Sequence, residues 1–329
     1  MRYDLTVAII GTGYMGKIYA EVLASLVNNM IFCSTDEQGG KALAEQYSSD
    51  FYSDYLELFE TEKIDFAAIC LPTHLHCRAA LAAMERGISV LCEKPFASTE
   101  EEAKEMIKTA KSTGVLFMIA HCLRFSKSYE YLRRCIADER FGKLLSLNVY
   151  REHQSPRWSV DNWLHNIALS GGVVKDSHIH DTDMMIGWLG VPESVYTTGS
   201  YTSCRTVYDY GASLAASASA SWRDIKSFPA ESGYDALFEH ACIRNCNYQV
   251  TVYTDNERFD PFEREVFSEF FSGSIYENEI HYFCYCLVNK EYPLLCPPED
   301  SLKTISVNCA ESKSLESHAK KIRRVTSNG

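Results

Sequence analysis

The chain has 329 residues, a formal net charge of −12 at pH 7 and a sequence pI of about 5.3. This acidic balance disfavours nucleic acid as a partner. The length suggests two domains. Apolar residues make up 46% of the sequence and charged residues 23%, as in an ordinary globular protein. No segment reaches the apolar length of a membrane span, so we expect no membrane partner.

The chain opens with a predicted strand, a glycine-rich turn and a helix. The apolar run at residues 5–10 predicts a buried strand, and residues 17–26 carry apolar side chains at helical spacing. Between them, Gly11, Gly13 and Gly16 form G-x-G-x-x-G in the context that dinucleotide binding requires. The predicted cofactor contacts in this turn are Gly11, Thr12, Gly13, Tyr14, Met15 and Gly16.

Strands and helices continue to alternate up to about residue 120. This repetition predicts a parallel sheet with helices on both faces, whose ligands bind at the carboxyl ends of the strands. Ser98 and Glu101 form a predicted capping box at the start of the last of these helices. The predicted strands are residues 30–33, 64–70, 88–92 and 115–120, and the predicted helices are residues 41–47, 75–86 and 98–113.

The pattern changes after about residue 124. Residues 126–138 predict a helix, residues 144–151 a half-exposed strand, and residues 194–267 are rich in strand-forming Thr, Ser, Tyr and Val. Residues 302–324 predict a terminal helix. We therefore predict an α/β protein. Residues 1–123 form a Rossmann domain with a doubly wound parallel sheet, and residues 124–329 form an α+β domain with a large, mostly antiparallel sheet.

The thirteen cysteines do not form a metal-binding pattern. None is part of a C-x-x-C pair, and several lie in apolar strands, where cysteine behaves as a small hydrophobic residue. We therefore predict reduced thiols and no metal site. Because the first residues lead directly into a strand, we expect no signal peptide and a cytoplasmic location.

Four segments of the chain follow one another as GTGYMG at residues 11–16, LPTHLH at 71–76, CEKP at 92–95 and GGVVKDSHIHD at 171–181. In these motifs and their order the chain resembles the Gfo/Idh/MocA oxidoreductases, which include glucose–fructose oxidoreductase and inositol dehydrogenase. The resemblance covers residues 5 to about 190. It implies a nicotinamide cofactor, a sugar or cyclic polyol as substrate, and transfer of a hydride between them.

The resemblance also implies the catalytic residues. Lys94, followed by a cis-Pro95, would lie at the nicotinamide and the substrate hydroxyl, and His180 would be the general base. Asp176, four residues before His180 and on the same helical face, would bind the substrate and tune the histidine. From the residues alone, Lys94 also fits a salt-bridged strand end. Asp176 and His180 also fit a helix-stabilising ion pair. They would also fit two ligands of a zinc ion, but the sequence shows no third ligand at a suitable spacing.

Further cofactor contacts are expected after the strands. Leu71 departs from the Thr or Ser usual in the family, His76 either contacts the cofactor or only caps its helix, and His121 is either a contact or a core histidine. Trp158, Asn162 and Trp163 suit a sugar, although a loop packed on the second domain has the same composition. The predicted contacts of the cofactor after these strands are Leu71, Thr73, His74, His76, Glu93, Lys94 and His121.

The end of the second strand bears on the choice between NAD and NADP. Asp36 lies at the distance from the fingerprint expected for the acid that binds the ribose of NAD. Counted back from the following helix, as in the family, the position falls on Ser34, with Thr35 next to it, and a serine accommodates the 2′-phosphate of NADP. No arginine follows, and Asp36 would repel a phosphate. The sequence favours NAD and leaves NADP open.

Two other functions use the same motifs. Some family members are NAD-dependent glycosidases that oxidise the sugar only transiently, and a regulatory branch senses cofactors or sugars without catalysis. Lys94, Asp176 and His180 argue against a sensor, which needs no proton-transfer groups. The large sheet of the second domain leaves a face to bury, so we also expect a homo-oligomer, a dimer or tetramer.

Overall fold

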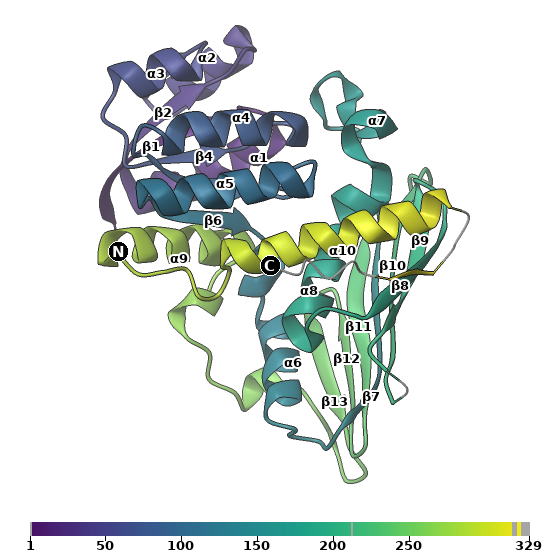
Figure 1. Cartoon of the computed structure of the whole chain (residues 1–329). Helices are drawn as coiled ribbons and strands as arrows, with labels where there is room; N and C mark the ends of the chain where they lie inside the picture. The colour runs from purple at the N-terminus through teal and green to yellow at the C-terminus, as the bar shows by residue number, and fades with distance from the viewer. Residues whose placement is uncertain (1, 212, 318–320, 324–329) are drawn as a thin grey trace. The chain divides into compact units, whose positions relative to one another are not determined.

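The computed structural model describes residues 2–211, 213–317 and 321–323, which form two compact units (Figure 1). The first unit contains the described residues up to Cys122 together with Trp158–Trp163 and Glu269–Leu302. The second unit contains Leu123–Arg157, Leu164–Ser268 and the described residues from Lys303 onward. The chain thus passes between the two units several times.

The first unit is built on a six-stranded parallel sheet with the order β3-β2-β1-β4-β5-β6. This is the strand order of a doubly wound dinucleotide-binding sheet, so the predicted fold is confirmed. The strand order reverses between β1 and β4, and ligands of such sheets bind outside the carboxyl ends of the strands at that point. The strands are β1 (Tyr3–Ile10), β2 (Val27–Cys33), β3 (Asp50–Tyr52), β4 (Phe66–Ile69), β5 (Ser89–Glu93) and β6 (Phe117–Ala120).

Helices cover both faces of this sheet. Figure 1 shows α4 and α5 lying side by side, and α1 packs against α9. The cap of α5 is Thr99, whose hydroxyl accepts from the N–H of Glu102 at 3.2 Å, so the predicted box at Ser98 and Glu101 is wrong by one residue. The helices are α1 (Tyr14–Leu26), α2 (Glu37–Gln46), α3 (Tyr55–Thr61), α4 (Thr73–Met84), α5 (Glu100–Thr113) and α9 (Ile275–Asn289).

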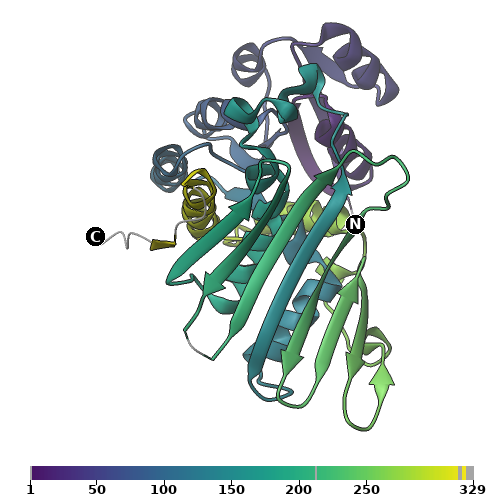
Figure 2. The same ribbon diagram turned by 90° about the vertical axis from the view of Figure 1, so that its right-hand side faces the viewer.

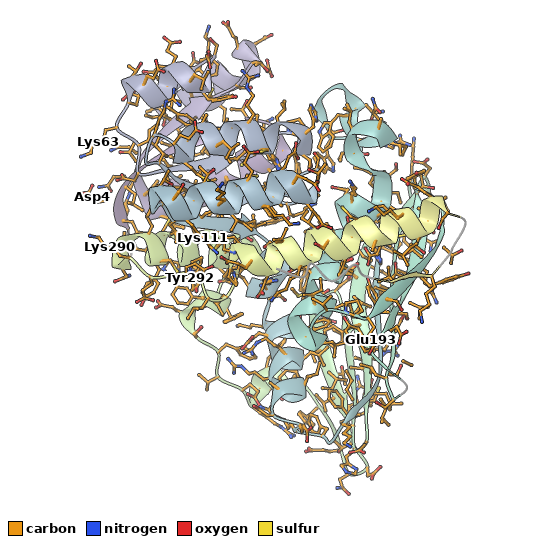
Figure 3. All side chains as sticks on the ribbon, in the orientation of Figure 1. Asp4, Lys63, Lys111, Glu193, Lys290 and Tyr292 are labelled. Carbon is orange, nitrogen blue, oxygen red and sulfur yellow. The ribbon has the colours of Figure 1, made fainter. Side chains whose placement is uncertain are left out.

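A late segment of the chain is tied to this unit by polar contacts. The carboxylate of Glu299 accepts from Lys111 Nζ at 2.7 Å and from the hydroxyl of Tyr292; Figure 3 labels both donors. The Sγ of Cys296 donates to the carbonyl of Ile119 at 3.1 Å, next to the end of β6. Residues 269–302 are therefore part of the first unit although they follow the large sheet in sequence.

The second unit contains a nine-stranded sheet with the order β14-β13-β12-β11-β7-β10-β9-β8-β15. All neighbours are antiparallel except β7 and β10, which confirms the predicted mostly antiparallel sheet. The strands are β7 (Leu144–Gln154), β8 (Ser194–Gly199), β9 (Ser203–Asp209), β10 (Ala215–Arg223), β11 (Glu231–Phe238), β12 (Cys242–Cys246), β13 (Gln249–Tyr253), β14 (Arg258–Phe259) and β15 (Ile322–Arg323).

The two faces of this sheet differ. On one face α8 (Ile179–Leu189) packs against β7 and β10, and α6 (Lys127–Ala137) packs against α8. Figure 2 shows the opposite face of the sheet. Tyr196, Val207 and Leu237 are exposed and alternate with buried residues along their strands, so they lie on that face. The last helix, α10 (Pro298–Glu316), ends earlier than the predicted 302–324: Ile322–Arg323 is a strand, and residues 318–320 and 324 lie outside the described residues.

Buried thiols lie within the first sheet. Cys33 on β2 and Cys92 on β5 are buried, and burial raises the pKa of Cys33 to about 12, which keeps the thiol protonated. In the described ranges, no three His, Cys, Asp or Glu side chains come together as a metal site would require. Among the described helices, none has the length and apolar character to cross a membrane.

Two fully buried histidines make stability depend on pH. Burial lowers the pKa of His76 to about 4 and that of His178 to about 3, whereas an unfolded chain titrates near 6.5. The unfolded chain therefore binds more protons at intermediate pH. Each histidine contributes its full stability above about pH 6.5 and loses it on acidification.

We predict that each histidine lowers the free energy of unfolding between about pH 6.5 and pH 4, by up to about 1.4 kcal/mol per pH unit. Urea unfolding of the wild type and of His76→Gln at pH 7 and pH 5 isolates the contribution of His76. His76→Gln cannot take up the proton, so acidification should destabilise the variant less than the wild type. An equal change in both proteins would contradict the assignment.

Candidate functional site

The glycine-rich turn forms a cradle at the start of α1. Gly11 has φ +101°, and a Cβ there would lie 2.6 Å from the carbonyl oxygen of Cys70, while a Cβ on Gly16 would lie 1.9 Å from that of Gly11. Neither position accepts a side chain. At Gly13, by contrast, a Cβ would meet no described atom within 4 Å, and φ is an ordinary −70°. The open space beside the first N–H groups of α1 fits the phosphates of a dinucleotide.

The end of β2 lies at the same edge of the sheet. The Oγ of Ser34 accepts from the N–H of Asp36 at 3.1 Å, and Oδ1 of Asp36 accepts from the N–H of Gly39 at 3.0 Å, which caps α2. Thr35 and Asp36 are exposed. One carboxylate oxygen of Asp36 thus caps the helix.

The loops after β4 and β5 are joined by His76. Its Nδ1 lies 2.8 Å from the carbonyl oxygen of Pro95, and its Nε2 lies 2.6 Å from that of Leu71. Both partners are acceptors, and the neutral ring donates to one of them. The sequence suggested a cofactor contact or a cap for His76; its ring nitrogens instead face the backbone of the two loops. Thr73 is buried at the start of α4, and His74 is exposed.

Lys94 directly follows β5. The Lys94–Pro95 peptide is cis, as the family resemblance implied. The Lys94 N–H donates to a carboxylate oxygen of Glu93 at 3.2 Å, and the lysine side chain is half-buried. His121 follows β6 and is 2% exposed. Because the strands are parallel, these residues lie at the edge that also carries the glycine cradle.

The predicted substrate residues Trp158 and Trp163 lie in a segment that packs with the first unit. The ring of Trp158 stacks on that of Tyr14, with centroids 4.7 Å apart and an interplanar angle of 28°. The ring of Trp163 meets His74 edge-on at 6.4 Å, and Asn162 is exposed. Both tryptophans therefore contact residues predicted to bind the cofactor.

Asp176 and His180 lie in the second unit. Asp176 belongs to a π-helical turn, Val174–His178, that continues into α8, and His180 is the second residue of α8; both are half-buried. His178 is fully buried, with its Nε2 2.9 Å from Thr206 Oγ1, so it points away from this pair as its spacing predicts.

Buried ion pairs brace the helix that carries His180. Arg151 of β7 donates to Asp181 at 2.9 Å, and Arg124 donates two hydrogen bonds of 2.8 Å to Asp183. All four residues are in the second unit. These contacts connect α8 to its surroundings on two sides.

Two groups of residues in the second unit were not found from the sequence. Glu311 on α10 is fully buried and accepts from Tyr208 at 2.7 Å, while Ser177 Oγ lies 2.9 Å from His153 Nε2 and 3.2 Å from Asp176 Oδ2. Burial raises the pKa of Glu311 to about 7. Ser177 and His153 are 24 residues apart, so no local pattern links them.

Both units match sequence models of one family. Residues 5–121 match the oxidoreductase family with an NAD-binding Rossmann fold, and residues 129–226 match the GFO/IDH/MocA C-terminal domain. The chain belongs to the GFO/IDH/MocA oxidoreductase family. The resemblance seen in the four sequence motifs is thereby confirmed, and the NAD-binding fold of the first unit with it.

Several GFO/IDH/MocA relatives have named activities. The chain is 30% identical over 193 residues to 2,7-anhydro-N-acetylneuraminate hydratase of Mediterraneibacter gnavus, a match covering 58% of this chain and 51% of that protein. It is 26% identical over 200 residues to myo-inositol 2-dehydrogenase of Thermotoga maritima, covering 60% and 58%. The chain thus spans little more than half the length of these curated relatives.

The fold is also that of solved structures. An oxidoreductase from Agrobacterium radiobacter, in complex with NAD⁺, L-tartaric acid and magnesium, superposes with a TM-score of 0.81 at 17% identity, covering 98% of both chains. This likeness shows that the chain has the fold of that oxidoreductase.

We predict that Gly13→Val lowers NAD affinity by at least about 100-fold, or about 2.7 kcal/mol, and leaves the fold intact. The valine would fill the space read as the phosphate cradle without meeting a described protein atom. Calorimetry with NAD measures the affinity, and circular dichroism measures the fold.

Gly187→Val is the matched control, because a Cβ at Gly187 also meets no described atom within 4 Å but lies in the second unit. It should keep the wild-type affinity. An unchanged affinity in Gly13→Val would refute the cradle.

Proposed function

We propose that this protein is an NAD(P)-dependent dehydrogenase that acts on a hydroxyl-bearing carbon of a sugar or cyclic polyol. The main support is the open cradle at Gly13, at the point where the strand order of an NAD-binding Rossmann fold reverses. The activity of the myo-inositol 2-dehydrogenase relative supports the substrate class. The bound nicotinamide supplies the hydride acceptor or donor.

The proposed roles of the protein residues follow from the family motifs. The Lys94 ammonium donates a hydrogen bond to the substrate hydroxyl and stabilises the developing negative charge on its oxygen. The His180 imidazole accepts the hydroxyl proton, and Asp176 orients both the substrate and the histidine. Trp158, Asn162 and Trp163 are proposed sugar contacts, since an aromatic face packs against C–H groups and an amide bonds to hydroxyls.

A substrate panel tests the proposal. Inositols, aldoses and anhydrosugars are each incubated with the protein and NAD or NADP, and the formation of reduced cofactor is followed by absorbance. We expect oxidation of at least one cyclic polyol or pyranose. Tight cofactor binding without turnover of any panel member would instead favour the sensor function.

A second function is supported by the hydratase relative. An enzyme that oxidises its substrate transiently, eliminates or adds at the neighbouring carbon and then reduces it again releases no net NADH. Product analysis with 2,7-anhydro-N-acetylneuraminate separates the two. Conversion with NAD unchanged at the end supports this candidate, and net NADH formation with a panel sugar supports the dehydrogenase.

We predict that Lys94→Ala and His180→Ala each lose turnover by about 10²–10⁴-fold, as expected for a lost general acid or base, and keep NAD affinity. Steady-state rates with the best panel substrate measure the first effect, and calorimetry measures the second. The losses should not add in the double variant, because residues that act as a unit are non-additive. Near-normal turnover in either single variant would contradict the mechanism.

Of the two cofactors we propose NAD, because the Asp36 carboxylate caps α2 at the ribose position and repels a 2′-phosphate. We predict that Thr35→Arg with Asp36→Ser raises the ratio of NADP to NAD affinity, since arginine pairs with a phosphate. The serine keeps the cap of α2, so folding should be unaffected. An unchanged ratio would mean that the ribose binds elsewhere.

We further propose a homo-oligomer that buries the open face of the nine-stranded sheet. Two exposed apolar residues of this face, Tyr196 and Val207, are paired across β8 and β9, and Leu237 of β11 is also exposed. We predict a dimer or tetramer at micromolar concentration by light scattering, and a smaller species for Val207→Lys. A monomeric wild type would contradict this.

A further inference from the structure

The hydroxyl of Ser177 is surrounded by three polar groups of the second unit. It is 3% exposed. Its Oγ lies 2.8 Å from Nε1 of Trp222, 2.9 Å from Nε2 of His153 and 3.2 Å from Oδ2 of Asp176. The contacts come from β10, from β7 and from the π-helical turn itself. Ser177 therefore connects the aspartate proposed for catalysis with a half-buried histidine.

The chemistry of each partner limits where the hydrogens lie. The indole N–H of Trp222 only donates, so it occupies one lone pair of the serine oxygen. Nδ1 of His153 lies 2.8 Å from the carbonyl oxygen of Gln154, which only accepts, so Nδ1 carries a hydrogen. Nε2 is then the nitrogen of His153 that gains or loses a proton, and it faces Ser177.

Two hydrogen arrangements satisfy every one of these contacts. In the first, His153 is an imidazolium that donates to Ser177, and Ser177 donates to an ionised Asp176. In the second, His153 is neutral and accepts from Ser177, which in turn accepts from a protonated Asp176. The two arrangements hold the same number of protons. They differ only in the position of one proton, which is on His153 in the first and on Asp176 in the second.

We propose that Ser177 relays a proton between Asp176 and His153. The inference rests on the proposed role of Asp176 and adds two positioning residues to it. A proton on Asp176 bonds to Ser177 Oγ while the serine proton moves to Nε2 of His153. Asp176 is left ionised, His153 is left as an imidazolium, Ser177 is unchanged, and no other reactant is needed. The reverse transfer returns the proton to Asp176.

Charged groups lie around His153. Asp176 lies at the other end of the relay, and Asp181 of α8 interacts electrostatically with His153. Arg151, on the same strand as His153, is bound to Asp181 at 2.9 Å and offsets part of that charge. Trp222 of β10, which pairs with His153 of β7, brings no charge.

A double-mutant cycle with NMR detection tests the connection without a substrate. The NAD-bound full-length protein is titrated, and the His153 ring signal is assigned by its loss in His153→Asn. Asp176→Asn should lower the titration midpoint of His153 in the wild-type background. The shift should largely vanish when Ser177 is already alanine, because the hydroxyl carries the coupling. An equal shift in both backgrounds would overturn the relay and leave only direct electrostatics.

Kinetics provide the second arm. With myo-inositol, or the panel compound oxidised fastest, His153→Ala and Ser177→Ala should lose less turnover than the about 10²–10⁴-fold expected for a lost general base. Added imidazole should restore turnover in His153→Ala, because position 153 is only half-buried, but not in Ser177→Ala. Ser221→Ala, the same change on β10 outside the relay, should behave as wild type. Absence of rescue would overturn the relay.

The two arms separate this inference from the proposed function. If no panel compound is oxidised, the dehydrogenase proposal fails, while the NMR cycle still decides whether Ser177 couples His153 to Asp176. If the panel succeeds and the cycle shows no coupling, the dehydrogenase stands and the relay falls.

Discussion

The close approach of backbone to backbone at the first turn is the constraint on which the first unit depends. Because α1 starts so near β1, a side chain at Gly16 would collide with the carbonyl of Gly11, and one at Gly11 would collide with that of Cys70. The same closeness brings the end of β4 beside the turn, through a hydrogen bond of 2.8 Å from the N–H of Cys70 to the carbonyl of Ile10. The helix N-terminus is thereby aimed at the edge where the strand order reverses.

The other loops at that edge are held by polar contacts between backbone and side chain. His76, buried and neutral, joins the loop after β4 to the one after β5, which carries Lys94. A lysine at the end of a strand has many accessible rotamers. The contacts of His76 fix the backbone of the loop and so limit the positions that the lysine side chain can reach. The tryptophans at 158 and 163 add aromatic contacts to Tyr14 and His74 at the same edge. The unit thus offers a rigid frame for a cofactor.

The second unit uses buried charges in a comparable way. Asp181 and Asp183 on α8 are each paired with an arginine, and the buried Glu311 receives hydrogen bonds from Tyr208 and Asn308. Breaking one partner of such a pair costs about 3–5 kcal/mol, because the other charge is left buried and unpaired. These contacts hold the turn and helix that carry Asp176 and His180. Buried polar groups therefore specify one orientation of that helix rather than merely stabilising it.

The parallel sheet, the antiparallel sheet and the glycine cradle were all predictable from the sequence, because each depends on local patterns. Apolar runs, glycine spacing and strand-to-helix alternation are short-range signals. The fingerprint at residues 11–16, for example, lies entirely within one turn between a strand and a helix. Two helix boundaries were predicted wrongly. The N-cap of α5 is Thr99 rather than Ser98, and α10 ends at Glu316 rather than several residues later. The sequence alone does not distinguish between neighbouring caps of similar strength.

What tertiary structure alone decided are the contacts between residues far apart in the chain. Nothing in the sequence ties His76 to Pro95, Trp158 to Tyr14, or His153 to Ser177, because each pair is brought together by sheet register and helix packing. The sequence determined which residue types stand at the strand ends and on α8. Which of them meet depends on how the elements pack, and hydrogen bonds of this kind are formed only when burial excludes water as the alternative partner.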